Sequence, residues 1–113
     1  MEILASRVLL RPTDFERSVA FYRDTLSLAV FREFGAGVVF FIGGGYLEVS
    51  GREGPVASDK LSLWLQVRDL ATTFAPLAAA GVEVVEEPVL KFWGLLEARV
   101  RDPDGVLLVL VEV

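Results

Sequence analysis

The sequence predicts an α+β fold built from two βαβββ modules, and two observations carry this prediction. First, the order strand, aspartate, amphipathic segment and strand occurs twice, from Arg7 (RVLLRPTDFERSVAFYRDTLSLAVF) and from Ser62 (SLWLQVRDLATTFAPLAAAGVEVVE). Second, the polar, glycine-bearing segment GREGPVASDK separates the copies. We therefore expect one domain over residues 1–113, with modules at about 1–51 and 60–113 and a linker at about 52–59.

Composition limits the class of protein. The chain is 53% hydrophobic and 24% charged, as globular domains are, and it has no cysteine, which excludes disulfides and fits a cytoplasmic location. Its net charge is −5 and its basic residues are scattered, so we expect no nucleic-acid partner. We also expect no membrane partner, because the N-terminus lacks signal-peptide features and no apolar run reaches the roughly 18 residues that cross a bilayer.

An aspartate marks the start of each predicted helix. In the first copy, four apolar residues have the spacing of one helical face: Phe15, Val19, Tyr22 and Leu26. Thr13 and Glu16 have capping-box spacing, and Asp14 is an alternative N-cap. In the second copy, Asp69 is the predicted N-cap and Gly81 the predicted end, while Pro76 predicts a bent or short helix.

Three strands are predicted after each helix. The first half has them at 28–34, 37–42 and 46–50, with glycine turns at 35–37 and 43–45. The second half has them at 82–87, around 95–101 and at 106–113, with a DPDG turn at 102–105. Glu86 and Glu87 are expected in a solvated loop before Pro88. Since each helix covers one sheet face, pairing the halves predicts a cupped mixed sheet with helices outside, a natural place for a small molecule.

A set of short motifs supports this arrangement over nearly the whole chain. They are Asp14, Ser18, Phe21-Tyr22, Asp24, Leu26, Val67-Arg68-Asp69, Ala80-Gly81-Val82, Pro88, Trp93-Gly94 and Arg101-Asp102-Pro103-Asp104-Gly105. In this order, and with the internal repeat, they resemble the vicinal oxygen chelate superfamily of glyoxalases, extradiol dioxygenases and bleomycin-resistance proteins. Ser27 departs from the pattern, because that family commonly has glycine there.

The resemblance implies four metal-ligand positions on the first and last strands of each half, usually filled by histidine, glutamate or glutamine. In this sequence they fall at Arg7, Glu48, Ser62 and Val109. Only Glu48 is an ordinary ligand, since arginine is a permanent cation and valine has no ligand atom. The chain also lacks histidine. We therefore expect no metal and no other cofactor, with Arg7 in the place of the metal and paired with Glu48.

Side-chain alternation extends the candidate ligand site from these positions. Leu9 shares a face with Arg7, Tyr46 shares one with Glu48, and Trp64 and Gln66 share one with Ser62. The predicted site, including three aromatic residues near the rim, is Arg7, Leu9, Phe40, Tyr46, Glu48, Ser62, Trp64, Gln66, Phe92, Trp93 and Val109. It suits a flat hydrophobic ligand. Two alternatives stay open: Trp64 as a core residue, and Arg7 and Glu48 as solvent-exposed strand residues.

These residues are compatible with three functions. The first is metal-independent binding or sequestration of a small aromatic or hydrophobic compound, as in antibiotic resistance, by a homodimer of the kind that the resemblance implies. The second is a metal-free isomerase, epimerase or cyclase with Glu48 as base and Arg7 as oxyanion partner, although a neighbouring arginine lowers the proton affinity that such a base needs. The third is a divalent-metal lyase or dioxygenase.

Overall fold

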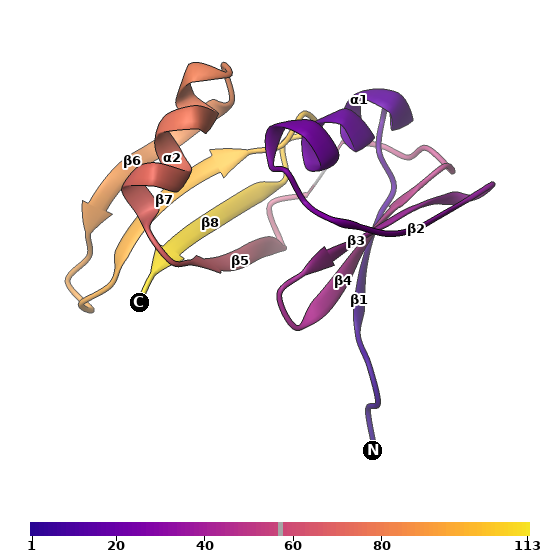
Figure 1. The fold of residues 1–113 in the computed structure, drawn as a ribbon, viewed down its shortest axis with the longest axis horizontal. Coiled ribbons are helices and arrows are strands. Elements are labelled where there is room, and N and C mark those ends of the chain that lie inside the picture. The colour runs from indigo at the N-terminus through magenta and orange to yellow at the C-terminus, as the bar shows by residue number, and fades with distance from the viewer. Residues whose placement is uncertain (57) are drawn as a thin grey trace. The chain divides into compact units, whose positions relative to one another are not determined.

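The computed structural model describes residues 1–56 and 58–113. The chain forms two compact units, Met1–Val56 and Ala57–Val113, and each is described by itself. Each unit contains a four-stranded sheet and one helical segment placed between its first and second strands (Figure 1). The predicted α+β class with two βαβββ modules is therefore confirmed. Among the described residues, no helix is long and apolar enough to cross a membrane.

The first module begins with strand β1 (Arg7–Leu10). Helix α1 (Phe15–Ala20) follows and continues directly into a π-helical turn, η1 (Phe21–Thr25). Three strands complete the module: β2 (Val30–Phe34), β3 (Gly37–Ile42) and β4 (Gly45–Ser50). The sheet order is β1-β4-β3-β2, with β1 parallel to β4 and the other pairs antiparallel.

The second module repeats this plan. Strand β5 (Ser62–Val67) leads to helix α2 (Leu70–Ala79), and three strands follow: β6 (Glu83–Leu90), β7 (Leu96–Arg101) and β8 (Leu107–Glu112). The sheet order is β5-β8-β7-β6, and again only the first and last strands pair in parallel. The two modules thus have the same topology, as the internal repeat predicts.

Both helices start where an aspartate side chain accepts a backbone hydrogen bond. Asp14 Oδ1 accepts from the Arg17 N–H and Asp69 Oδ1 from the Thr72 N–H, each at 3.1 Å. Of the two N-cap candidates in the first copy, Asp14 holds the position. Helix α2 runs through Pro76 to Ala79, and Gly81 follows it with a φ of +80°, a conformation that favours glycine.

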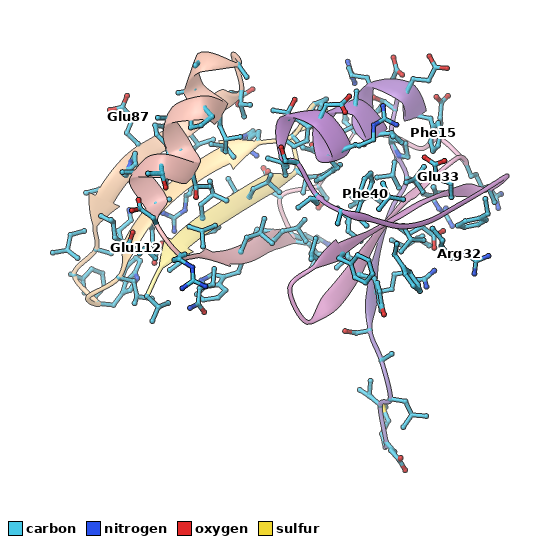
Figure 2. The ribbon with its side chains drawn as sticks, in the orientation of Figure 1. Phe15, Arg32, Glu33, Phe40, Glu87 and Glu112 are labelled. Atoms are coloured by element: carbon cyan, nitrogen blue, oxygen red, sulfur yellow. The ribbon has the colours of Figure 1, made fainter. Side chains whose placement is uncertain are left out.

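Each sheet buries one face against its own helical segment. In the first module, Leu47 and Val49 of β4 are fully buried, and the Phe40 ring lies 6.3 Å from the Tyr22 ring of η1. Figure 2 shows Phe40 on the side of the sheet where α1 lies. In the second module the fully buried residues on this side are Leu70 of α2 and Ala98, Val100 and Leu108 of the sheet. Because strand side chains alternate, the residues between those that face the helix define an open face on each sheet.

The last part of β6 differs from the prediction. Glu86 and Glu87 lie within this strand rather than in a loop, and the strand continues past Pro88 to Leu90. Proline lacks the N–H that a central strand needs, but β6 is an edge strand of its sheet. The strand therefore accommodates Pro88, and Glu86 becomes a residue of the open face.

Candidate functional site

The open face of the first module carries four of the predicted site residues. Arg7 and Leu9 of β1 pair in register with Tyr46 and Glu48 of β4. The residues between them on β4, Leu47 and Val49, are the buried ones, so these four side chains lie on the opposite side of the sheet. Leu9 is 54% exposed there.

Arg7 and Glu48 form an ion pair on this face. Arg7 Nη1 donates to Glu48 Oε1 at 2.7 Å, as the sequence predicts for a cation opposite this carboxylate. The Arg7 guanidinium also lies 5.8 Å from the centre of the Tyr46 ring, within the range of a cation–π contact. The Glu48 side chain is only 14% exposed, so Glu48 is not a solvent-exposed strand residue.

An aromatic cluster beside this ion pair was not predicted from the sequence. The rings of Phe31, Phe41 and Tyr46 lie 4.9–5.7 Å apart, each in contact with the other two. Phe31 is 45% exposed and Phe41 is 42% exposed. Together with Leu9 they make the open face of this module largely apolar.

Phe40 does not belong to this face, because the turn before β4 is shorter than predicted. Ile42 pairs with Gly45, so the turn consists of Gly43 and Gly44 alone, and Phe41 pairs with Tyr46. A turn of all three glycines would instead pair Phe40 with Glu48. A shift of one residue reverses the faces of a strand, so Phe41 takes the open position and Phe40 is buried against Tyr22.

The open face of the second module carries Ser62, Trp64 and Gln66. These three alternate with the less exposed Leu63, Leu65 and Val67 along β5. Trp64 is 53% exposed, which is too much for a residue that fills the core. Trp64 pairs with Val109 of β8 as Leu9 pairs with Glu48 in the first module. Val109 therefore occupies the position that corresponds to Glu48.

A network of charged side chains crosses the same face, and it too was not predicted. Glu97 and Arg99 of β7 pair with Val111 and Val109. The Glu97 side chain is only 5% exposed; its Oε2 accepts from Trp93 Nε1, and its Oε1 lies 3.1 Å from Arg99 Nη2. Arg99 Nη1 donates to Glu86 Oε1 at 2.8 Å.

Glu86 is the meeting point of two cations in this network. Its Oε1 contacts both the Lys91 ammonium and the Arg99 guanidinium. The hydrogen bond from Lys91, helped by the charges of Lys91 and Arg99 and opposed by desolvation, holds the pKa of Glu86 below its usual value of 4.5. Glu86 therefore stays ionised at neutral pH and fixes both cations.

The two remaining predicted residues lie at the turn between β6 and β7. Gly94, with a φ of +94°, closes this turn by donating its N–H to the Lys91 carbonyl. Phe92 is 95% exposed and Trp93 is 48% exposed, and their rings meet edge to face at 4.6 Å. Trp93 belongs to the charged network through Glu97, whereas Phe92 contacts Trp93 at the exposed tip.

The residues at the four ligand positions do not fit a divalent metal. In the first module the permanent positive charge of Arg7 lies in contact with Glu48, which is the one carboxylate among the four ligand positions. In the second module the positions hold the Ser62 hydroxyl and the Val109 isopropyl group. Among residues 1–56 and 58–113, no group of three or more histidine, cysteine, aspartate or glutamate residues is placed to hold a metal ion.

Comparison with known proteins identifies the family. A family model described as the glyoxalase/bleomycin resistance protein/dioxygenase superfamily matches residues 5–110. The chain belongs to this superfamily. No curated protein sequence matches it.

Solved structures share the fold over the full length of the chain. The protein SMU.1112c is 25% identical over 99% of both chains, with a TM-score of 0.83. A glyoxalase-related enzyme from Fulvimarina pelagi is 21% identical, with a TM-score of 0.81 over 100% of this chain and 89% of that one. A protein of unknown function from Agrobacterium tumefaciens is 24% identical, with a TM-score of 0.80 over 100% and 94% of the two chains.

Proposed function

We propose that the protein binds a small aromatic or hydrophobic compound without a divalent metal, as the bleomycin-resistance members of its superfamily do. The Arg7–Glu48 ion pair is the observation that supports this most. It neutralises the one carboxylate among the four ligand positions with a cation that never loses its proton. The position that corresponds to Glu48 in the second module is a valine, which adds no ligand atom.

Each open face, taken by itself, offers apolar contacts to such a ligand. Leu9, Phe31 and Phe41 are each about half-exposed on the first module, and Trp64 on the second. Exposed aromatic side chains are typical of binding surfaces, because a flat ring gains contact area with little loss of side-chain entropy. Sequestration of an antibiotic-like compound is a role that this surface supports.

The proposal includes a homodimer, the assembly that is typical of bleomycin-resistance proteins. Light scattering coupled to size-exclusion chromatography tests it directly. We expect the mass of two chains, and the mass of a single chain at micromolar concentration would contradict the dimer.

The metal-free mode is tested by two measurements on the purified, tag-free protein. Mass spectrometry of the metal content after incubation with zinc, nickel, manganese and iron(II) is expected to find substoichiometric metal. Calorimetric titration with a panel of fused-ring aromatic compounds is expected to give the same affinity with and without EDTA. Stoichiometric metal, or binding that EDTA abolishes, would favour the divalent-metal lyase or dioxygenase instead.

Trp64→Ala is expected to weaken binding of an aromatic ligand by about two- to tenfold, since stacking on an aromatic ring contributes roughly 0.5–1.5 kcal/mol. The matched control is Leu61→Ala, which removes an 82% exposed apolar side chain just before the same strand. Because both side chains are largely exposed, neither change should affect folding greatly. Calorimetry measures both affinities, and an unchanged affinity of the Trp64 variant would contradict the proposed ligand contact.

A metal-free isomerase, epimerase or cyclase is the second candidate. It draws support from the similarity to the glyoxalase-related enzyme from Fulvimarina pelagi. In this mechanism Glu48 takes a proton from the substrate and the Arg7 guanidinium, 2.7 Å away, stabilises the oxyanion that forms. Product analysis after incubation with each compound that binds distinguishes the two candidates: unchanged compound supports the binder, and a new isomer supports the enzyme.

A further inference from the structure

The charged network of the second module, formed by Glu86, Lys91, Glu97 and Arg99, lies on the open face and includes none of the four ligand positions. Glu97 is nearly fully buried although it lies on the sheet face opposite the core residues Ala98 and Val100. Both of its carboxylate oxygens have partners, Trp93 Nε1 and Arg99 Nη2. Burying a carboxylate is costly unless it is paired and hydrogen-bonded, so these contacts hold Glu97 in place.

The charges of this network balance. Glu86 and Glu97 are two carboxylates, and Lys91 and Arg99 are two cations that contact them. An anionic or cationic ligand that docks here loses hydration and meets no net opposite charge in return. An uncharged ligand does not incur this cost.

Two tryptophans lie beside the network. Trp64, Val109 and Arg99 are neighbours in one cross-strand row, so the Cα atoms of Trp64 and Arg99 are about 10 Å apart. The Trp93 indole N–H donates a hydrogen bond to Glu97. Trp64 and Trp93 are each about half-exposed, so their rings offer flat apolar surface next to hydrogen-bonding groups that are already oriented.

The network also retains hydrogen-bonding capacity. A guanidinium group has five N–H donors, and a carboxylate accepts more than one hydrogen bond. The Arg99 side chain is 25% exposed, and Glu86 is 37% exposed. A ligand oxygen can accept from Arg99, and a ligand N–H can donate to Glu86, without breaking the ion pairs.

We propose that this face, formed by Trp64, Trp93, Glu97 and Arg99, selects uncharged aromatic compounds that carry a carbonyl or amide group. The inference rests on the proposed binding function and names its ligand class. Arg99 contacts the ligand oxygen, and Glu97 sets the preference for an uncharged ligand because it completes the charge balance.

Three probes with the same ring test this selection: 2-naphthamide, 2-naphthoate and 2-naphthylmethylammonium. The chain has only two tryptophans, so a ¹H–¹⁵N spectrum has two indole N–H signals, which Trp64→Phe and Trp93→Phe assign. We expect 2-naphthamide to shift both signals saturably. The anion and the cation should each bind at least about tenfold more weakly, a difference of about 1.4 kcal/mol.

Glu97→Gln tests the origin of the preference. Glutamine can still accept from Trp93, but the network then has one cation in excess. We expect the affinity for 2-naphthoate to rise at least about tenfold relative to that for 2-naphthamide. This is the same factor by which the balanced charges of the wild type are expected to disfavour the anion. The control is Glu87→Gln, which makes the same change of net charge at an exposed position of β6 (Figure 2) and should keep the wild-type affinity ratio of 2-naphthoate to 2-naphthamide.

Arg99→Lys provides a second variant, should Glu97→Gln fold poorly. Lysine keeps the charge and loses the planar fork, so it should weaken 2-naphthamide binding and leave 2-naphthoate binding weak. An unchanged ratio of 2-naphthoate to 2-naphthamide affinity in Glu97→Gln, or an unchanged 2-naphthamide affinity in Arg99→Lys, overturns the inference while the binding function stands. Indole signals that respond to none of the probes overturn it as well. The binding function itself is tested separately, and it falls if the calorimetric panel finds no ligand that binds without metal or if the purified protein holds stoichiometric metal.

Discussion

Ser27 is the one non-glycine residue of the described chain with a positive φ, at +58°. It follows the π-helical turn η1, at the point where the Leu28 N–H returns to the Tyr22 carbonyl and the chain leaves the helix. The left-handed conformation is unfavourable for a residue with a Cβ and easy for glycine. The glycine that is common at this position in the superfamily therefore has a physical reason, and this chain departs from it at a cost in stability.

Ser27→Gly is expected to raise the free energy of unfolding by about 0.5–1 kcal/mol, because relief of the left-handed strain exceeds the extra freedom of glycine in the unfolded chain. Denaturation followed by circular dichroism measures the change. Ser27→Ala is the control, since it removes the hydroxyl and keeps the Cβ, and it should not stabilise the protein. Equal effects of the two substitutions would mean that the hydroxyl, rather than the backbone conformation, determines the result.

At the scale of elements, both helices begin with the same double arrangement of carboxylates. Besides its aspartate cap, each helix has a glutamate from further along the chain that accepts the first backbone N–H. Glu53 Oε2 accepts from Phe15 at 3.1 Å, and Glu112 Oε1 accepts from Leu70 at 2.7 Å. The positive end of the helix dipole favours such carboxylates. In the second module, this contact ties the end of β8 to the start of α2 (Figure 2).

Glu112→Ala is expected to lower the free energy of unfolding by about 1–3 kcal/mol, because it leaves the N–H of the buried Leu70 without its acceptor. Glu112→Gln keeps an acceptor oxygen and should cost less. Glu87→Ala, at an exposed position of the same module, serves as the control and should remain within about 0.5 kcal/mol of the wild type. Similar losses for the alanine and glutamine variants at Glu112 would show that charge, not the hydrogen bond, carries the effect.

The elements themselves were well predicted from the sequence, and the details of pairing were not. Caps, glycine ends and hydrophobic periodicity are local signals, and Asp14, Asp69 and Gly81 hold the places that these signals indicate. Strand register is not local. Gly43-Gly44-Gly45 is compatible with a turn of two or three residues, and the difference decides whether Phe40 or Phe41 reaches the open face.

The charged network could not be predicted from the sequence either, because it too depends on strand register. Glu86 and Arg99 are neighbours only through the pairing of β6 with β7, and that pairing contains register shifts on both sides of Glu86. By contrast, the ion pair of Arg7 with Glu48 was predicted, because the resemblance to the superfamily supplied the position of both residues. The Arg7–Glu48 contact could be predicted because the family resemblance indicates which residues face each other. The Glu86–Arg99 contact could not, because nothing in the local sequence gives the register of β6 on β7.

At the scale of the whole molecule, the positions where the superfamily's metalloenzymes hold their metal carry residues that fit a divalent ion poorly in both modules. The first module contributes Glu48 in contact with Arg7, and the second contributes Ser62 and Val109. A single substitution in one module therefore cannot restore the ligand set that the superfamily's metalloenzymes use.

Arg7→His is accordingly expected to give a protein that binds zinc only substoichiometrically after incubation and gel filtration, as measured by mass spectrometry. The control is Arg52→His, which adds an imidazole at an exposed position outside the strands. One zinc ion per chain in the Arg7 variant alone would show that the remaining residues do complete a metal site, and would reopen the metalloenzyme hypothesis.

The division of the chain into two units also separates its chromophores. Both tyrosines, Tyr22 and Tyr46, belong to the first module, and both tryptophans, Trp64 and Trp93, belong to the second. Fluorescence excited at the red edge of the absorption band thus arises in the second module only, while the tyrosine bands of the near-ultraviolet spectrum arise in the first. Each half of the repeat therefore has its own optical signal. If the unfolding transitions followed by tryptophan fluorescence and by the tyrosine bands coincide, the halves unfold as one cooperative unit; if the transitions separate, the halves unfold independently.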